Sequence, residues 1–136
     1  MRQSAITFED AETYVRAGWS QWLPLSNDAI KNLPPLPGVY EVRIKGYSFS
    51  RLRGQTSTIY IGSAERRELA KRLNGLVKDR HVARHRIERI KNELKTDLEF
   101  RFRVEFAAKK LERELLAEYD SQHLELPPCN HSLPRH

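Results

Sequence analysis

The stretch STIYIGSAE, residues 57–65, decides the architecture expected for this chain. Residues 58–61 are mostly β-branched or aromatic, which is the composition of a strand. The strand stops at Gly62, and small and polar residues follow it in place of a tight hairpin turn. Tyr60 therefore stands near the end of a predicted strand, close to a glycine. Why a tyrosine and a glycine stand at the end of this strand has to be inferred from the rest of the sequence.

Two further stretches have the two-residue period of strands. From residue 38 onward apolar and charged residues alternate, which predicts a half-buried strand. A long turn-rich loop connects it to residues 58–61, so these two strands are expected to form a hairpin. Residues 98–106 alternate without exception and predict a third strand with one apolar and one charged face. The apolar positions are Tyr40, Val42 and Ile44 in the first strand, and Leu98, Phe100, Phe102, Val104 and Phe106 in the third.

Apolar residues recur at helical spacing in the remaining stretches. Thr7 predicts the cap of a first helix, which ends before Gly18. Residues 69–94 carry two apolar stripes, so we expect two helices with a break at Gly75 or at residues 78–79. A last helix follows the third strand and ends before a Leu-Pro-Pro sequence. The stripes are Leu69, Leu73, Leu76 and Val77; Ala83, Ile87, Ile90 and Leu94; and Ala108, Leu111, Leu115 and Tyr119.

The predicted elements follow the order ββααβα, which gives an α+β fold with a small three-stranded sheet and flanking helices. Residues 36–136 form this domain. Residues 1–35 form an N-terminal helical or irregular extension, which Trp19 and Trp22 are expected to pack on the main body. An aromatic pair of this kind more often covers a core than stacks on bases.

Composition limits the class of protein. The chain has 136 residues, of which 39% are hydrophobic, and this suits one domain. Because it has no apolar run near the roughly 20 residues of a membrane span and no visible secretory signal, we expect a cytoplasmic protein without a membrane partner. Cys129 is the only cysteine, which excludes an intramolecular disulfide and a Cys-rich zinc site.

Basic residues are concentrated in one stretch. The net charge of the chain is +6, while residues 66–95 contain eleven Lys and Arg against four Asp and Glu. Such a concentration is typical of proteins that bind a polyanion, because each neutralised phosphate releases a counterion. A solvated helix face would have the same composition, and charge alone does not separate the two.

Two side chains stand out on local grounds. Glu112 shares one flank of the last helix with Leu115, Leu116 and Tyr119. A carboxylate in such surroundings is paired, lies at the rim or binds a cation. Arg72 lies early in the basic stretch, where a guanidinium would reach a phosphate across the edge of the sheet.

Five elements of the sequence, in this order, resemble the signature of the GIY-YIG nucleases. GVY ends at Tyr40 and YIG begins at Tyr60, on the first two predicted strands. AKRL contains Arg72 at the position of the catalytic arginine of that family, and LERELL contains Glu112 at that of its metal-binding glutamate. LPPCN supplies Asn130 at the closing asparagine position. The resemblance covers nearly the whole chain outside the N-terminal extension.

The resemblance implies a metal-dependent endonuclease that hydrolyses phosphodiester bonds in DNA, with double-stranded DNA as the expected partner. In such a site Tyr40 is the general base on the attacking water, and Tyr60 contacts a phosphate oxygen or orients the nucleophile. Arg72 stabilises the charge on the phosphorus. Glu112 binds one Mg²⁺ or Mn²⁺ ion, and Asn130 braces the site through its amide.

The resemblance also implies what surrounds these groups. Gly62 would let the backbone approach where a side chain would block the substrate or the turn. One active site cuts one strand, so cleavage of both strands needs a homodimer or sequential nicking. The residues expected to contact substrate are Gly38, Gly62, Arg66, Arg67 and Lys71.

Two departures from the family pattern are visible. Leu76 stands where many members carry a histidine or tyrosine one turn after the arginine. The loop between GVY and YIG, residues 41–59, is longer than the compact version. Its cations either contact nucleic acid or are solvated; they are Lys45, Arg51 and Arg53.

Two other classes of function stay open. The first is a catalytically inactive module of the same fold that binds nucleic acid through residues 66–95. The second is a partner-binding subunit whose docking surface is built around Trp19 and Trp22.

Overall fold

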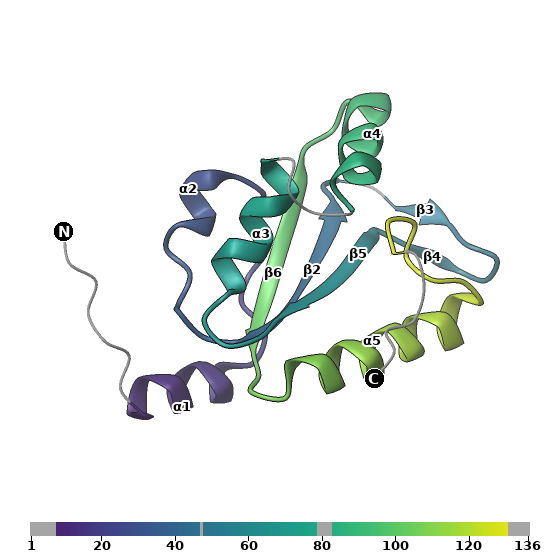
Figure 1. The fold of residues 1–136 in the computed structure, drawn as a ribbon. Helices are drawn as coiled ribbons and strands as arrows, with labels where there is room; N and C mark the ends of the chain where they lie inside the picture. Colours follow the sequence, from purple (N-terminus) through teal and green to yellow (C-terminus); the bar gives the residue numbers. More distant parts are fainter. Residues whose placement is uncertain (1–7, 47, 79–82, 131–136) are drawn as a thin grey trace.

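The structure is a computed structural model that describes residues 8–46, 48–78 and 83–130 (Figure 1). The predicted cap Thr7 lies outside these residues. The helices are α1 (Phe8–Ala17), α2 (Asn27–Ile30), α3 (Leu69–Val77), α4 (Arg84–Leu94) and α5 (Ala108–His123). The strands are β1 (Leu23–Pro24), β2 (Gly38–Ile44), β3 (Phe49–Ser50), β4 (Gln55–Thr56), β5 (Thr58–Ala64) and β6 (Leu98–Val104).

The fold is α+β, as predicted, but the prediction of a three-stranded sheet was wrong. The main sheet is antiparallel and has four strands in the order β1-β6-β2-β5. The added strand, β1, comes from the N-terminal extension, where Leu25 N donates to Leu98 O at 3.0 Å and Ser20 N to Phe102 O at 2.8 Å. Backbone groups along the outer edge of β6 would otherwise lack partners, so the extension completes the sheet.

One face of the sheet forms the main core. Tyr40 lies opposite Phe102 on β6 and opposite Gly62 on β5, and Val42 lies opposite Tyr60. Directly paired residues share a face of the sheet. Helices α3 and α4 cover this face, which we call the α3 face, and bury their apolar stripes against it. The buried helix residues in this core are Leu69, Leu73, Leu76 and Ile87.

The opposite face of β2 is also covered, so the prediction of a half-buried strand was wrong. Glu41 is 7% exposed and accepts a hydrogen bond of 2.7 Å from Arg101 Nε. The guanidinium of Arg101 lies 4.3 Å from the ring centre of Trp19, and that of Arg43 lies 4.0 Å from the ring centre of Trp22. The tryptophans therefore shield the charged face of the sheet from water, and cation–π contacts hold them there.

The predicted end of the third strand was wrong, whereas the later of the two places predicted for the break between the helices agrees with the structure. β6 ends at Val104, and Phe106 is 63% exposed although the alternation continued to it. α3 continues through the buried Gly75 and ends at Val77, so the break between the two helices does not lie at Gly75. In both places, packing ends or continues an element that the local pattern could not delimit.

Helix α5 covers the part of the second face formed by β5. Ile61 packs there with Leu116 and Tyr119, and the hydroxyl of Tyr119 donates to Thr58 O at 3.2 Å. Figure 1 shows α5 running along this side of the sheet. We call it the α5 face.

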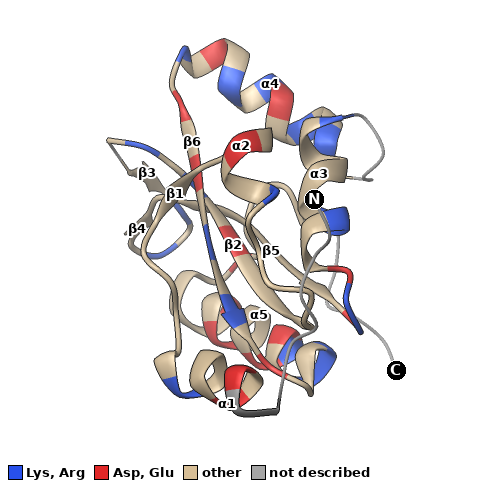
Figure 2. Ribbon diagram, turned by 90° about the vertical axis from the view of Figure 1, so that its left-hand side faces the viewer, with Lys and Arg blue, Asp and Glu red and all other residues tan. Residues whose placement is uncertain are grey.

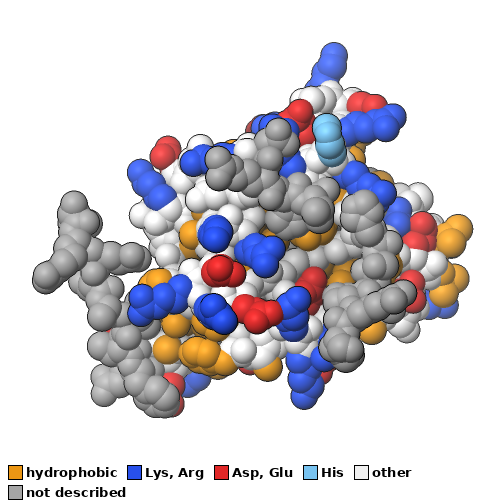
Figure 3. All heavy atoms as spheres, viewed as in Figure 1, with side chains coloured by type: hydrophobic (Ala, Val, Ile, Leu, Met, Phe, Trp, Pro, Cys, Tyr) orange, Lys and Arg blue, Asp and Glu red, His pale blue; other side chains and the backbone are white. Residues whose placement is uncertain are grey.

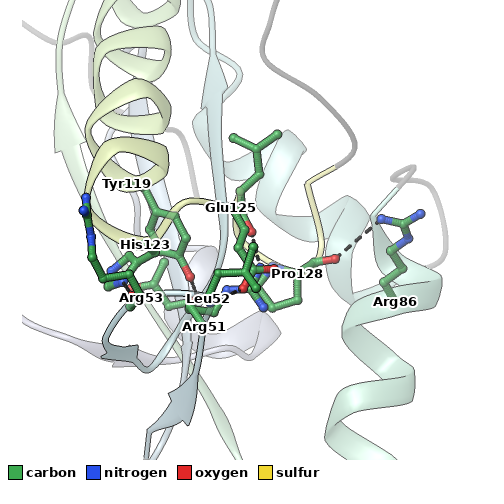
Figure 4. Close-up of polar contacts among 10 residues, drawn as sticks. Arg51, Leu52, Arg53, Arg86, Tyr119, His123, Glu125 and Pro128 are labelled. Atoms are coloured by element: carbon green, nitrogen blue, oxygen red, sulfur yellow. Dashed lines mark hydrogen bonds and ion pairs between the residues drawn. The ribbon is translucent and has the colours of Figure 1, made fainter.

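The long loop between β2 and β5 is bound to the end of α5 (Figure 4). Arg53 donates from Nε to Gln122 O at 2.9 Å and from Nη2 to Ser121 O. Arg51 pairs with Glu125 at 3.1 Å and also donates to a backbone carbonyl, that of Leu126. The last carbonyls of a helix have no partner within the helix, and the guanidinium of Arg53 supplies one, while Arg51 binds residues that follow α5. Both arginines thus attach the loop to the C-terminal part of the chain, and Arg53 stays exposed.

Replacing Arg53 by alanine should lower the free energy of unfolding by about 1 to 2 kcal/mol, because two hydrogen bonds from a charged donor are lost. Arg53→Lys retains the charge but not the planar fork, so it should recover only part of the loss. Urea unfolding followed by circular dichroism measures both changes. Equal stability of the alanine variant and the parent protein would show that the contacts contribute nothing.

Candidate active site

The two tyrosines of the GVY and YIG motifs meet on the α3 face. Tyr40 is 1% exposed and Tyr60 is 9% exposed, and their ring centres lie 6.1 Å apart. A hydrogen bond joins the two phenol side chains. Residues 20 positions apart in the sequence thus form one pair of phenols.

Gly62 makes room for the ring of Tyr40. A Cβ atom on Gly62 would lie 2.7 Å from Cζ and from the hydroxyl oxygen of Tyr40, closer than real Cβ atoms approach other atoms. The two residues are directly paired across β2 and β5. The glycine is therefore needed because the phenol of Tyr40 lies across the backbone of the neighbouring strand.

Both phenols are held in the protonated form. Burial is the largest cause that raises the pKa of Tyr40 well above its ordinary value, and the pKa of Tyr60 is raised for the same reason. The nearby carboxylate of Glu112 raises both pKa values further, whereas the guanidinium of Arg72 lowers both. Arg72 and Glu112 are consequently close enough to the phenols for all four groups to interact electrostatically.

Arg72 approaches the tyrosine pair from α3. It is exposed, and its backbone N–H donates to Glu68 O at 2.9 Å in the first turn of the helix. Leu76, one turn later, is 3% exposed and belongs to the main core. The position where many GIY-YIG nucleases carry a histidine or tyrosine is therefore occupied here by a core side chain.

Glu112 approaches from the opposite side of β5. Successive residues of a strand point to opposite faces, so Ser63 is on the α5 face while Tyr60 and Gly62 are on the α3 face. Ser63 Oγ donates to Glu112 Oε1 at 2.5 Å. Burial raises the pKa of the Glu112 carboxyl, and the hydrogen bond from Ser63 and the charges of nearby cations oppose this shift.

Asn130 binds the outer edge of β5 rather than a side chain of the site. Its Nδ2 donates to Ile61 O at 2.9 Å and its Oδ1 accepts from Ile61 N at 3.1 Å. The preceding residue, Cys129, donates from its backbone N to Ile59 O at 2.9 Å. The C-terminal segment thus replaces a further strand along β5 and fixes the backbone between Tyr60 and Gly62.

The predicted substrate contacts divide into two groups. Gly38 lies inside the sheet, where a Cβ would lie 2.4 Å from Arg103 O, so its place is explained by close packing of β2 and β6. Arg66, Arg67 and Lys71 are exposed near the start of α3, beside the end of β5. Only this second group is placed to meet a ligand.

Basic side chains do not form one uniform face. Figure 2 shows acidic residues interspersed with basic ones along α4. Arg84 pairs with Glu88, and Arg89 pairs with Glu93 at 3.1 Å. Figure 3 shows the same mixture of charges on the face viewed there. Because part of the charge of residues 66–95 is neutralised within α4, the cations around Arg72 are the better candidates for phosphate contacts.

A cavity of about 650 Å³ lies at the far end of the sheet from the tyrosine pair. It is lined by α4, by the N-terminal extension and by the residues where β6 begins, among them Leu25, Ile87, Lys91 and Leu98. None of the predicted catalytic residues lines it. We assign the candidate site to the end of β5, where the ionisable groups interact.

The donor set permits one weakly held divalent ion. Among the residues that the structure describes, no group of three or more His, Cys, Asp or Glu side chains gathers into a metal site. Mg²⁺ often uses only one or two carboxylates, together with waters and the phosphates of a substrate. Glu112, with its partly desolvated carboxylate, suits that mode of binding.

Ser63 is the site residue that the sequence did not single out. Its signal was its position directly after Gly62, on the opposite face of the same strand.

Comparison with known protein families, curated proteins and solved structures found no match. Among the helices of the described residues, none has the length and apolar composition needed to cross a membrane.

Proposed function

We propose that this protein is a metal-dependent endonuclease of the GIY-YIG type that hydrolyses phosphodiester bonds in DNA. The proposal is supported by the arrangement of four residues: the rings of Tyr40 and Tyr60 have centres 6.1 Å apart, and the charges of Arg72 and Glu112 act on both phenols. These four residues come from two strands and two helices. A phosphodiesterase needs such a combination of cation, carboxylate and hydroxyl groups around one phosphorus.

The order of the elements supports the proposal. β2, β5, α3, α4, β6 and α5 follow one another in the order ββααβα that the resemblance implies. The small β3-β4 hairpin is an insertion in the first loop, and β1 is an addition from the N-terminal extension. The motif residues then stand on β2, β5, α3 and α5, as in the proposed family.

In the proposed reaction, Arg72 binds the scissile phosphate and stabilises the charge that develops on it. Tyr60, the more accessible phenol, donates a hydrogen bond to a phosphate oxygen or to the attacking water. Tyr40 acts as the base through its minor phenolate form, and its hydrogen bond to Tyr60 links the two hydroxyls. Asn130 fixes the strand that carries Tyr60.

Glu112 would hold the Mg²⁺ or Mn²⁺ ion of this site. When bound, the ion supplies positive charge that stabilises the leaving oxygen. Burial raises the pKa of this carboxyl, so its charge is only partly solvated. Double-stranded DNA is the proposed partner, and cleavage of both strands by this single site would take a second copy of the chain or two successive nicks.

A plasmid assay tests the proposal. We expect the purified protein to convert supercoiled DNA to the nicked form with Mg²⁺, and to leave it intact with EDTA. Retardation of the same DNA should persist in EDTA, because the exposed cations near Arg72 bind phosphate without the ion. Retardation without any nicking, in Mg²⁺ or in Mn²⁺, would refute the nuclease proposal.

A catalytically inactive nucleic-acid-binding module is the second candidate. Two observations favour it: both phenols are buried and protonated, and the side chain one turn after Arg72 belongs to the core. The partner-binding subunit is less well supported, because the rings of Trp19 and Trp22 already contact arginine side chains of the sheet. The plasmid assay separates the inactive module from the enzyme.

The dependence of cleavage on pH should reveal the phenolate. Because the pKa of Tyr40 is raised above its ordinary value, the reactive form is a minor species at neutral pH. The single-turnover rate should therefore rise about tenfold for each pH unit through the neutral and mildly alkaline range, without a plateau. Gel assays at saturating Mg²⁺ measure this slope. A plateau near neutral pH would assign the base to another group.

A further inference from the structure

Residues 60–63 at the end of β5 each hold a different part of the proposed site. Tyr60 supplies a phenol, the backbone of Ile61 binds the amide of Asn130, and Gly62 makes room for the ring of Tyr40. Ser63 has no part in the proposed chemistry, yet its hydroxyl donates a hydrogen bond to Glu112 Oε1 at 2.5 Å. A polar contact between a strand residue and a helix residue 49 positions later requires an explanation.

We infer that Ser63 is a positioning residue, which holds the Glu112 carboxylate at the end of β5 in the orientation needed to bind a divalent cation. The inference rests on the proposed function, since it concerns the cation site of the same nuclease. It extends that function by one residue that does not itself touch the substrate. Ser63 would act only through Glu112.

The backbone around Ser63 gives the hydroxyl a fixed position. Ser63 is paired with Val39 across β2 and β5, next to the contact between Gly62 and the Tyr40 ring. Glu112, in contrast, has a long side chain whose rotamers α5 alone does not determine. A hydrogen bond from a rigid strand selects one of these rotamers and reduces the entropy that cation binding would otherwise cost.

The contact leaves one carboxylate oxygen available. Oε1 accepts from Ser63, while within the described part of the chain no donor contacts Oε2. Lys109, whose charge acts on Glu112 from the same helix, pairs with Glu65 at 3.8 Å. An anionic oxygen in partly desolvated surroundings, without a cation bonded to it, is suited to a hard divalent ion.

The test uses Ser63→Ala, the conservative Ser63→Thr and a control, Ser57→Ala, which removes a serine just before the same strand. Binding of Mn²⁺ to each full-length protein is measured by electron paramagnetic resonance, without DNA. The Mg²⁺ concentration that gives half-maximal nicking is measured separately. Ser63→Ala should weaken both by about 10- to 100-fold, as loss of a partner of a metal ligand generally does. Ser63→Thr should recover most of the loss, and Ser57→Ala should match the parent protein.

DNA retardation in EDTA supplies the readout that separates positioning from general damage. It should be equal for Ser63→Ala and the parent protein, because the site is intact apart from the cation. Unchanged Mn²⁺ binding by Ser63→Ala, or no Mn²⁺ binding by the parent protein, would overturn the inference. If the parent protein binds Mn²⁺ but never nicks DNA, the proposed function fails. In that case, weaker Mn²⁺ binding by Ser63→Ala than by the parent protein would still support the role of Ser63 in positioning Glu112.

Discussion

Replacing Arg72 with alanine is expected to reduce the rate of DNA cleavage by about a thousandfold, as loss of a cation that stabilises a transition-state phosphate typically does. The guanidinium also lowers the pKa of both Tyr40 and Tyr60. Its removal would leave fewer phenolate groups at any pH, in addition to the lost phosphate contact. Because the side chain is exposed, the fold should persist. Single-turnover cleavage of an end-labelled duplex measures the effect.

Two further variants serve as controls for the cleavage rate of Arg72→Ala. Arg72→Lys should recover part of the rate, since an ammonium group keeps the charge but not the bidentate geometry. Arg16→Ala removes an equal charge from an exposed position on α1 and should cleave at the rate of the parent protein. A rate for Arg72→Ala within about threefold of the parent protein would remove Arg72 from the site, since that factor corresponds to under 1 kcal/mol of activation free energy.

Gly62→Ala should reduce both stability and activity. The new Cβ would lie 2.7 Å from two atoms of the Tyr40 side chain, so the ring or the strand must move. Overpacking of this kind costs about 1 to 3 kcal/mol of unfolding free energy. Displacement of the phenol should reduce cleavage by about a hundredfold, since misplacement by about 1 Å is enough for that loss. Thermal unfolding and single-turnover cleavage measure the two effects.

A double-mutant cycle identifies the cause. Without the ring of Tyr40, Gly62→Ala should cost much less stability, so its effects with and without Tyr40→Ala should differ by more than about 1 kcal/mol. Additive effects would place the strain elsewhere. Gly18→Ala is a useful contrast, because no atom lies within 4 Å of its Cβ position and φ is +69°. Any loss at Gly18 arises from backbone conformation alone.

The features that the sequence predicted are those with a local period. The alternation of residues 38–44 and 98–104 indicated β2 and β6, and helical spacing indicated α3, α4 and α5. The same spacing placed Glu112 on the flank of α5 that carries Leu116 and Tyr119, both of which are buried. Periodicity depends only on neighbouring residues, and it survives in the folded chain wherever one face is packed.

The features that the sequence did not predict depend on contacts between residues that are distant in the chain. β1 has only two residues and therefore no period, and its partner β6 lies about 75 positions later. The hydrogen bond from Arg51 to Leu126, in the segment after α5, joins residues 75 positions apart. The alternation indicated a solvated charged face, so it did not predict that Glu41 would be buried and paired with the partly buried Arg101. Such contacts follow from how the elements pack, which a single sequence does not specify.

For the candidate site, the sequence named residues that lie near one another in the structure, while the roles of these residues stay predictions. The motifs named Tyr40, Tyr60, Arg72 and Glu112, and the structure brings these groups into electrostatic contact. They assigned Gly62 to an approach of substrate or backbone, whereas the structure shows that it accommodates a phenol ring. The sequence alone could not predict this role of Gly62, because it depends on the register of β2 and β5. Only direct pairing of Tyr40 with Gly62 brings the ring over the neighbouring strand.

The most direct test of the proposed site is cleavage by Glu112→Ala, measured together with DNA retardation on the same samples. Glu112 is the residue that must reach the tyrosine pair from the other side of β5, and it is the proposed ligand of the Mg²⁺ ion. Glu112→Ala should retard duplex DNA as the parent protein does but should no longer nick it at any Mg²⁺ concentration. Nicking by Glu112→Ala at the parental rate would contradict it.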